Sequence, residues 1–217
     1  MKWQIVLFDL DGTLTESGPG VTNGLIKVFE AFDIPIPTES EIRKYLGPPL
    51  SDSFAKFAGL RGADLDRAIQ IYRDYYREIG RFENSVFADI PQLLNQLTHA
   101  GKQLAVATSK FDQSAQSILE HFELSKHFQV IAGADEHGHL RGTKAKVIAH
   151  AITELGVTDL NSAVMIGDRE HDIHGANEHQ IESIGVLWGY GDAVELSSAG
   201  ATHIVSNVNE LSELLLG

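Results

Sequence analysis

The sequence predicts an α/β protein with a doubly wound, Rossmann-like parallel sheet and an all-helical domain inserted after the first strand of that sheet. Three observations support this fold class. Short, almost uninterrupted apolar runs recur along the chain, and segments with helical periodicity separate these runs from about residue 86 onward. Residues 20–83, by contrast, contain helical patterns without a strand-like run. Alternation of strands and helices is typical of a parallel sheet that helices cover on both faces.

The strand-like runs are rich in Val, Ile, Leu and Phe and show little alternation of polar and apolar residues. A strand that is buried on both faces has this pattern, so the runs indicate a parallel sheet. The expected strands cover residues 5–10, 103–108, 128–133, 163–167, 183–188 and 202–205.

Helical patterns fill the gaps between these strands and carry end signals. Residues 90–101 have a proline near the start and a glycine at the end, and residues 145–156 have apolar residues at helical spacing and again close with glycine. In residues 207–217, Asn207 precedes Glu210 by three positions, an arrangement typical of a helix N-terminus. These signals support a helix after each of several strands.

The residues that follow the first strand predict a separate helical domain. Thr38 and Glu41 form a capping box at the start of a helix that we expect to end at Gly47. Residues 63–80 have the apolar spacing of a long amphipathic helix. The insertion is therefore expected to fold as a small helical domain.

The boundaries of the two domains follow from the expected linkers, residues 16–20 and 81–86. We assign residues 1–17 and 85–217 to the α/β core domain and residues 18–84 to the helical domain. A chain of 217 residues is long enough for one sizeable core and a small inserted domain.

Composition and charge exclude several classes of protein. The formal net charge is −13, whereas a general nucleic-acid binder is expected to be basic. The chain has no cysteine, which excludes a disulfide framework and a thiolate metal site. The apolar run before Asp9 is too short for a signal peptide or a membrane span. We therefore expect a cytoplasmic protein without nucleic-acid or membrane partners.

Pairs of acidic residues follow two of the predicted strands. Asp9 and Asp11 lie at the exit of the first strand, Asp168 follows the strand at residues 163–167, and Asp172 comes one helical turn later. The carboxyl ends of parallel strands meet at one edge of a sheet, where ligands bind. Clustered carboxylates repel one another and lose hydration, and a hard divalent cation offsets both costs. The sequence therefore predicts a Mg²⁺ site at this edge.

Two further segments supply hydrogen-bond donors and positive charge. Thr108, Ser109 and Lys110 end a predicted strand, and hydroxyl and backbone N–H groups at a helix N-terminus form a phosphate site. Lys144 begins a predicted helix, and Lys146 is its rival; we favour Lys144 because it precedes the apolar face of that helix. Together with the carboxylates, these residues predict phosphate chemistry beside a metal ion.

These motifs resemble those of the haloacid dehalogenase superfamily, and within it the phosphoglycolate-phosphatase-like branch. FDLDGTL (8–14) is similar to the first motif, VATSK (106–110) to the second, Lys144 to the third and MIGDREHDIHGA (165–176) to the fourth. The resemblance covers the whole chain. It identifies the helical insert as similar to the family's small cap domain, with residues 46–54 resembling the entry to a cap helix.

The resemblance implies a role for each candidate residue. Asp9 would be the nucleophile that forms an aspartyl-phosphate, and Asp11 the general acid and base. Mg²⁺ would be bound by the side chains of Asp9 and Asp168, by the backbone carbonyl of Asp11 and with help from Asp172. The oxygens of the transferring phosphoryl group would be bound by Gly12, Thr108, Ser109 and Lys144. Many relatives carry Lys-Pro at the third motif, and this sequence has Lys-Ala there, which keeps Lys146 as an alternative.

The resemblance thus implies a Mg²⁺-dependent phosphomonoester hydrolase for a small phosphorylated metabolite, with 2-phosphoglycolate as the leading substrate. A 5′-nucleotidase is the alternative within the same reaction class. A non-catalytic phosphate sensor or interaction protein is the alternative outside it, but a sensor has no need of both Asp9 and Asp11. We expect a monomer or a weak homodimer.

Overall fold

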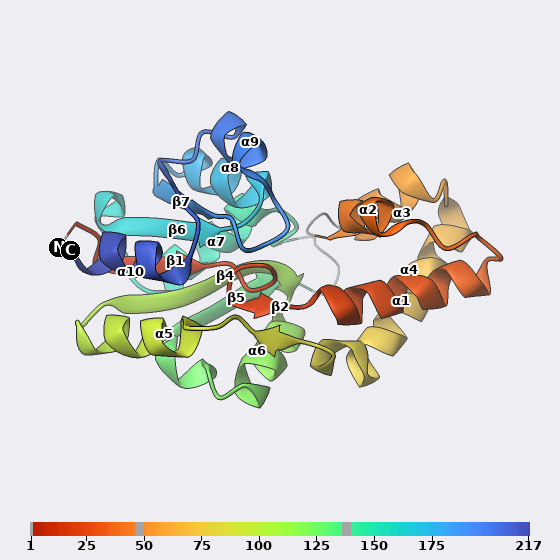
Figure 1. Cartoon of the computed structure of the whole chain (residues 1–217), viewed down its shortest axis with the longest axis horizontal. Helices are drawn as coiled ribbons and strands as arrows, with labels where there is room; N and C mark the ends of the chain where they lie inside the picture. Colours follow the sequence, from red (N-terminus) through yellow and green to blue (C-terminus); the bar gives the residue numbers. More distant parts are fainter. Residues whose placement is uncertain (1, 47–49, 136–139) are drawn as a thin grey trace. The chain divides into compact units, whose positions relative to one another are not determined.

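The computed structural model describes residues 2–46, 50–135 and 140–217, which fold into two compact units (Figure 1). One unit comprises Met1–Glu16 and Val86–Gly217, and the other comprises Ser17–Ser85. The first contains the parallel sheet, and the second is built mainly from helices. The function of the second unit as a cap stays a prediction.

Six parallel strands form the sheet, in the order β5-β4-β1-β6-β7-β8. The central strand β1 pairs with β4 on one side and β6 on the other, so that Phe8 is level with both Val106 and Ile166. The doubly wound α/β fold that the apolar runs predict is confirmed. The strands are β1 (Ile5–Phe8), β4 (Gln103–Phe111), β5 (Val130–Ala134), β6 (Ala163–Gly167), β7 (Glu182–Val186) and β8 (His203–Val205).

Helices cover both faces of the sheet because successive residues of β1 point to opposite faces (Figure 1). Val6 and Phe8 pack in one core with apolar residues of α5, α6 and α10, whereas Ile5 and Leu7 pack in a second core with α7 and α8. The helices of this unit are α5 (Ile90–His99), α6 (Asp112–His121), α7 (Lys144–Glu154), α8 (Glu170–Glu178), α9 (Ala193–Ser198) and α10 (Val208–Leu216).

Four of the six strands end at places that differ from the sequence-based boundaries: β5 by one residue, β7 by two, and β1 and β4 in the region of the acidic residues. β1 ends at Phe8, because the chain turns after Asp9 and the N–H groups of Leu14 and Thr15 both donate to the carbonyl of Leu10. β4 runs on to Phe111, with an irregularity in its pairing with β5 after Ala107. Both differences change the backbone that surrounds the acidic residues.

The second unit consists of helices and short 3₁₀ turns, as expected for residues 20–83. Its elements are α1 (Gly18–Ala31), α2 (Glu39–Ile42), η1 (Arg43–Tyr45), α3 (Leu50–Phe57), α4 (Gly62–Glu78) and η2 (Gly80–Phe82). The predicted capping box is present, since the N–H of Thr38 donates to Glu41 over 2.8 Å. The expected helix end at Gly47 lies outside the described residues.

The first predicted linker is wrong in part. Residues 16–20 were expected to be irregular, but α1 already begins at Gly18, with Pro19 in its first turn. Proline is tolerated there because the first N–H groups of a helix have no partner within the helix. The chain leaves and re-enters the α/β unit instead through β2 (Thr15–Glu16) and β3 (Ser85–Val86), which pair with each other.

Glu83 ties the start of α1 to the end of α4 within the helical unit. Its backbone carbonyl accepts from the N–H of Gly20 at 3.0 Å, and its carboxylate accepts from Asn23 at 3.1 Å and from the hydroxyl of Tyr75 at 2.7 Å. Gly20 passes so close to Gly80 that a Cβ at position 20 would overlap the Gly80 carbonyl oxygen. These contacts make the two ends of the unit one packed structure.

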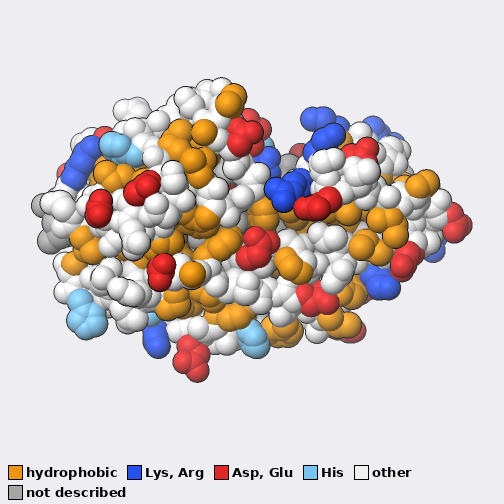
Figure 2. Space-filling view, in the orientation of Figure 1, with side chains coloured by type: hydrophobic (Ala, Val, Ile, Leu, Met, Phe, Trp, Pro, Cys, Tyr) orange, Lys and Arg blue, Asp and Glu red, His pale blue; other side chains and the backbone are white. Residues whose placement is uncertain are grey.

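Acidic, basic and apolar side chains are interspersed over the face that Figure 2 shows. Within residues 2–46, 50–135 and 140–217, no helix combines the length and the apolar character that crossing a membrane requires.

The contact between Gly20 and Gly80 predicts an unusual result for Gly20→Ala. Alanine at a helical position normally stabilises a protein relative to glycine. Here we expect the opposite, a loss of about 1–3 kcal/mol, because the added methyl group overpacks the contact with Gly80. Urea unfolding followed by circular dichroism measures the change. Asp66→Ala, at an exposed position of α4, is the control. A stabilised Gly20→Ala protein would contradict this packing.

Candidate active site

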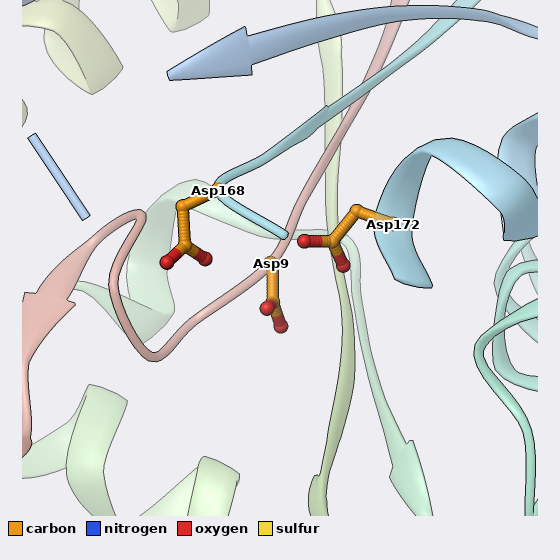
Figure 3. Close-up of side chains that lie close together, drawn as sticks. All are labelled: Asp9, Asp168 and Asp172. Atoms are coloured by element: carbon orange, nitrogen blue, oxygen red, sulfur yellow. The ribbon is translucent and has the colours of Figure 1, made fainter. Parts of the chain in front are cut away.

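Three carboxylates meet at the carboxyl edge of the sheet, where the sequence predicts them (Figure 3). Asp9 follows β1 and Asp168 follows β6, and these strands are neighbours, with the Asp9 N–H donating to the Ile166 carbonyl at 2.9 Å. Asp172 lies in the first turn of α8. One oxygen from each of the three side chains lies within 4.8 Å of the others, and all three residues are buried.

Backbone groups fix the direction of two of these carboxylates. The N–H of Tyr190 donates to Asp168 Oδ2 at 2.8 Å, and the N–H of Arg169 donates to Asp172 Oδ2 at 3.1 Å. Gly12 has a φ of 81°, and a Cβ there would overlap the Asp168 carboxylate. Glycine is therefore required at position 12 both for the turn and for space beside Asp168.

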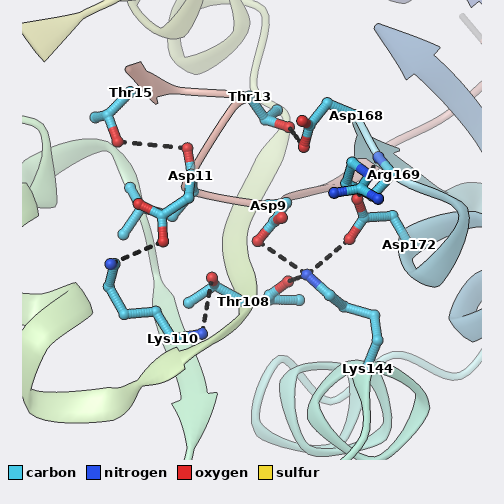
Figure 4. A network of polar contacts seen from close by, with 12 residues as sticks. Asp9, Asp11, Thr13, Thr15, Thr108, Lys110, Lys144, Asp168, Arg169 and Asp172 are labelled. Atoms are coloured by element: carbon cyan, nitrogen blue, oxygen red, sulfur yellow. Dashed lines mark hydrogen bonds and ion pairs between the residues drawn. The ribbon is translucent and has the colours of Figure 1, made fainter. Parts of the chain in front are cut away.

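Lys144 supplies positive charge to this cluster (Figure 4). It is the first residue of α7, and its buried Nζ lies 2.8 Å from Asp9 Oδ1 and 2.7 Å from Asp172 Oδ1. The same ammonium group donates to the carbonyl of Ala107 at 3.1 Å. Lys146 is exposed on the same helix. Of the two rival lysines, the structure therefore brings Lys144 to the carboxylates.

The acidic cluster is electrostatically strained without a further cation. Burial raises the pKa of Asp168 well above its ordinary value, and the charges of Asp172 and Asp9 raise it further. Burial also raises the pKa of Asp172 to about 6, although Lys144 opposes that shift. For Lys144, burial lowers the pKa, but the charges of Asp172 and Asp9 outweigh burial and raise it above its ordinary value.

The donor set fits a hard divalent cation. All three clustered residues offer carboxylate oxygens, and a single ammonium group, Lys144, forms ion pairs with two of them within the described ranges. Oxygen ligands with an excess of negative charge are what Mg²⁺ binds in proteins. A cation among these oxygens would remove the repulsion that raises the pKa of Asp168 and Asp172.

Asp11 points away from the other three carboxylates. Its Oδ2 lies 2.8 Å from Lys110 Nζ, and its side chain is not part of the cluster formed by Asp9, Asp168 and Asp172. In Figure 4, Lys110 pairs with Asp11 on one side of Asp9, and Lys144 pairs with Asp9 and Asp172 on the other. A role for the Asp11 backbone carbonyl in metal binding stays a prediction.

The predicted phosphate-binding residues have a different backbone setting from the one expected. Thr108 is buried and its hydroxyl accepts from the N–H of Lys110 at 3.2 Å, whereas Ser109 is exposed. The sequence placed Thr108 and Ser109 at a helix N-terminus, but β4 continues to Phe111 and α6 begins only at Asp112. The strand is longer because its residues near Phe111 pair again with β5.

Two parts of this site were missed by sequence reasoning. Lys110 was noted in the second motif, but its pairing with Asp11 was not anticipated. Tyr190 was not considered, although it donates its N–H to Asp168 and its hydroxyl to Glu16 at 3.1 Å. The available signal was the pair of glycines around Tyr190 directly after a predicted strand, which is typical of close backbone approach.

The chain is similar in sequence and in overall structure to known proteins. The family model described as "Haloacid dehalogenase-like hydrolase" matches residues 6–186. Tyrosine-protein kinase PtkA of Mycobacterium tuberculosis (strain ATCC 25618 / H37Rv) is 40% identical over 98% of this chain and 72% of its own length. A 5′-nucleotidase of Pseudomonas aeruginosa is 35% identical over 99% of this chain and 96% of its own. The crystal structure of a predicted phosphatase from Clostridium acetobutylicum superposes with a TM-score of 0.94 at 42% identity and covers 100% of this chain and 99% of that one. The chain therefore belongs to the haloacid dehalogenase-like hydrolases, as its motifs predict.

Proposed function

We propose that this protein is a Mg²⁺-dependent phosphomonoester hydrolase that acts through an aspartyl-phosphate on Asp9. The observation that carries the proposal is the position of Asp9, whose carboxylate pairs with Lys144 and clusters with those of Asp168 and Asp172 at the edge of the sheet where ligands bind. An anion held this way is a nucleophile next to positive charge, as phosphoryl transfer requires.

The metal would be held by the side chains of Asp9 and Asp168, with Asp172 as a further ligand and the backbone carbonyl of Asp11 as another. Mg²⁺ would supply electrostatic stabilisation of the charge on the transferring phosphoryl group. The fit rests on the oxygen-only donor set and on the mutual repulsion of its carboxylates.

The reaction can be written with the residues of this chain alone. Asp9 attacks phosphorus, the bond from phosphorus to the ester oxygen breaks, and Asp11 gives its proton to the departing alkoxide. Water then attacks the aspartyl-phosphate, its proton goes to Asp11, and inorganic phosphate leaves with Asp9 regenerated. Asp11 thus returns to its starting protonation state after each turnover.

The phosphoryl oxygens need donors, since three of them carry negative charge during transfer. Lys144 lies 2.8 Å from Asp9 and is positioned to offset charge on the group that Asp9 receives. We assign further contacts to the hydroxyl of Thr108 and to the backbone N–H groups of Gly12 and Ser109. Gly12 lies in the loop after β1, whereas Thr108 and Ser109 lie in the last part of β4.

The substrate that we propose is a small organic phosphate. The motif resemblance favours 2-phosphoglycolate, and the relative named 5′-nucleotidase favours a nucleoside 5′-monophosphate. The relative named tyrosine-protein kinase adds a second candidate function, transfer of a phosphoryl group to tyrosine. We assign the choice of substrate to the helical unit Ser17–Ser85, by analogy with family cap domains.

One experiment separates these functions. Release of inorganic phosphate is measured with Mg²⁺ from p-nitrophenyl phosphate, 2-phosphoglycolate, AMP and phosphotyrosine, and label transfer from ATP to a tyrosine peptide is measured in parallel. We expect phosphate release that excess EDTA abolishes, and an unfolding temperature that rises with Mg²⁺ because only the folded cluster binds the ion. Full turnover in EDTA would refute the metal, and labelling of the peptide without phosphate release would refute the hydrolase.

Asp9→Asn and Asp11→Asn should differ in how the leaving group affects the loss of activity. Asp9→Asn removes the nucleophile, so turnover should vanish for every substrate. Asp11→Asn removes proton transfer, which contributes typically about 10²- to 10⁴-fold. An alkyl phosphate should suffer this loss in the first step. Acetyl phosphate should still phosphorylate Asp9, because its leaving group, acetate, needs no proton.

Intact mass spectrometry after exposure to acetyl phosphate provides the measurement. The Asp11→Asn protein should carry one phosphoryl group, because the water that clears it has lost its base. The assigned roles would be wrong if the Asp9→Asn protein carried the same adduct.

Lys144→Met and Lys146→Met form a matched pair that tests the choice between the two lysines. Removing Lys144 leaves Asp9 and Asp172 buried without their ion-pair partner, which should destabilise the fold by about 3–5 kcal/mol and lower kcat by about 10²-fold or more. Lys146 is exposed, so its replacement should change stability by less than about 0.5 kcal/mol. Urea unfolding and steady-state kinetics measure both effects, and equal losses in the two variants would contradict the assignment.

A further inference from the structure

Lys110 forms an ion pair with Asp11 that has no role in the reaction proposed above. Its Nζ lies 2.8 Å from Asp11 Oδ2, and its side chain is 9% exposed against 24% for that of Asp11. Both residues belong to the α/β unit, Asp11 in the loop after β1 and Lys110 near the end of β4. An exposed ion pair contributes little to stability, but a shielded one fixes the geometry of its carboxylate.

The two oxygens of Asp11 are not equivalent in this arrangement. Oδ2 is held by Lys110, whereas Oδ1 is buried and accepts no hydrogen bond from a described residue. A carboxylate that exchanges protons with substrate needs one oxygen that no protein donor occupies and the other anchored, because free rotation would spread the group over unproductive orientations. The observed pairing provides this asymmetry.

Lys110 is itself fixed by the backbone that surrounds it. Its N–H donates to the hydroxyl of Thr108 at 3.2 Å, and it lies where the pairing of β4 with β5 is irregular, between Ala107 and Phe111. A strand irregularity of this kind re-aims side chains, and such features are common beside active sites. Thr108, which we assign to phosphate binding, thus also fixes the segment that carries Lys110.

We propose that Lys110 is a positioning residue that holds Asp11 Oδ2 so that Oδ1 exchanges the proton with the leaving group and with water. This inference rests on the proposed hydrolase function. It separates the work of two lysines: Lys144 acts on Asp9, and Lys110 acts through Asp11. Direct binding of substrate by Lys110 is the competing explanation, and the two make different kinetic predictions.

The test compares Lys110→Met, Lys110→Arg, Asp11→Asn and the double variant Asp11→Asn/Lys110→Met. The substrates are β-glycerol phosphate, an alkyl ester that needs a proton at its leaving oxygen, and acetyl phosphate, which does not. Lys2→Met is the matched control, because it removes an exposed lysine whose Nζ lies 2.7 Å from Glu182 in the α/β unit. Circular dichroism confirms that each variant is folded.

We expect Lys110→Met to lower kcat for β-glycerol phosphate by about 10- to 100-fold, a part of what general acid catalysis contributes, with little change in KM. Phosphorylation of Asp9 by acetyl phosphate should stay within about threefold of the parent rate. Lys110→Arg should restore most of the kcat. The double variant should be no slower than Asp11→Asn alone, because the two residues act as one unit.

Equal losses for both substrates, a rise in KM without a fall in kcat, or additive losses in the double variant would overturn the positioning role. A parent protein without phosphatase activity would overturn the proposed function and this inference with it. Leaving-group selectivity in Asp11→Asn without a matching effect of Lys110→Met would overturn the inference alone.

Discussion

The site depends on one buried interaction, the ammonium group of Lys144 between Asp9 and Asp172. Sheet topology alone brings Asp9 and Asp168 to the same edge, since their strands are neighbours and parallel. Topology does nothing about the free energy of burying their charges, which is several kcal/mol for each unpaired ion. Lys144 compensates part of that cost and also donates to the Ala107 carbonyl, so that one group of α7 connects the end of β1, the middle of β4 and the start of α8. The ion pairs of Lys144 thus stabilise the folded site and also place positive charge beside Asp9.

The sheet and the acidic cluster could be predicted because each depends on local patterns. A continuous apolar run fixes a buried strand, and the residues after parallel strands must share an edge, which places Asp9 beside Asp168 without further information. The choice of Lys144 over Lys146 could also be predicted from the sequence. Lys144 precedes the apolar face of its helix, whereas Lys146 lies in the exposed part of that helix. These inferences need only periodicity and strand order.

Other features depend on side-chain directions or on contacts between distant segments, which a pattern does not contain. The extension of β4 past Thr108 depends on renewed pairing near Phe111 with Ala134 of β5, and the partner of Lys110 depends on that extension. The start of α1 at Gly18 was misjudged because glycine and proline are typical both of linkers and of helix beginnings. In that case the contact with Gly80, far along the chain, favours the helix.

The hydrogen bond from Gly20 to Glu83 has a consequence for how this fold can be varied. It brings the two chain ends of the helical unit close together within that unit. In this respect the unit resembles a short surface loop, whose two ends are also close together. Next to this hydrogen bond, the pairing of β2 with β3 brings the chain together where it leaves and re-enters the α/β unit. Replacing residues 17–85 by the corresponding segment of a relative would therefore leave the strands that carry Asp9 and Asp168 unchanged in sequence.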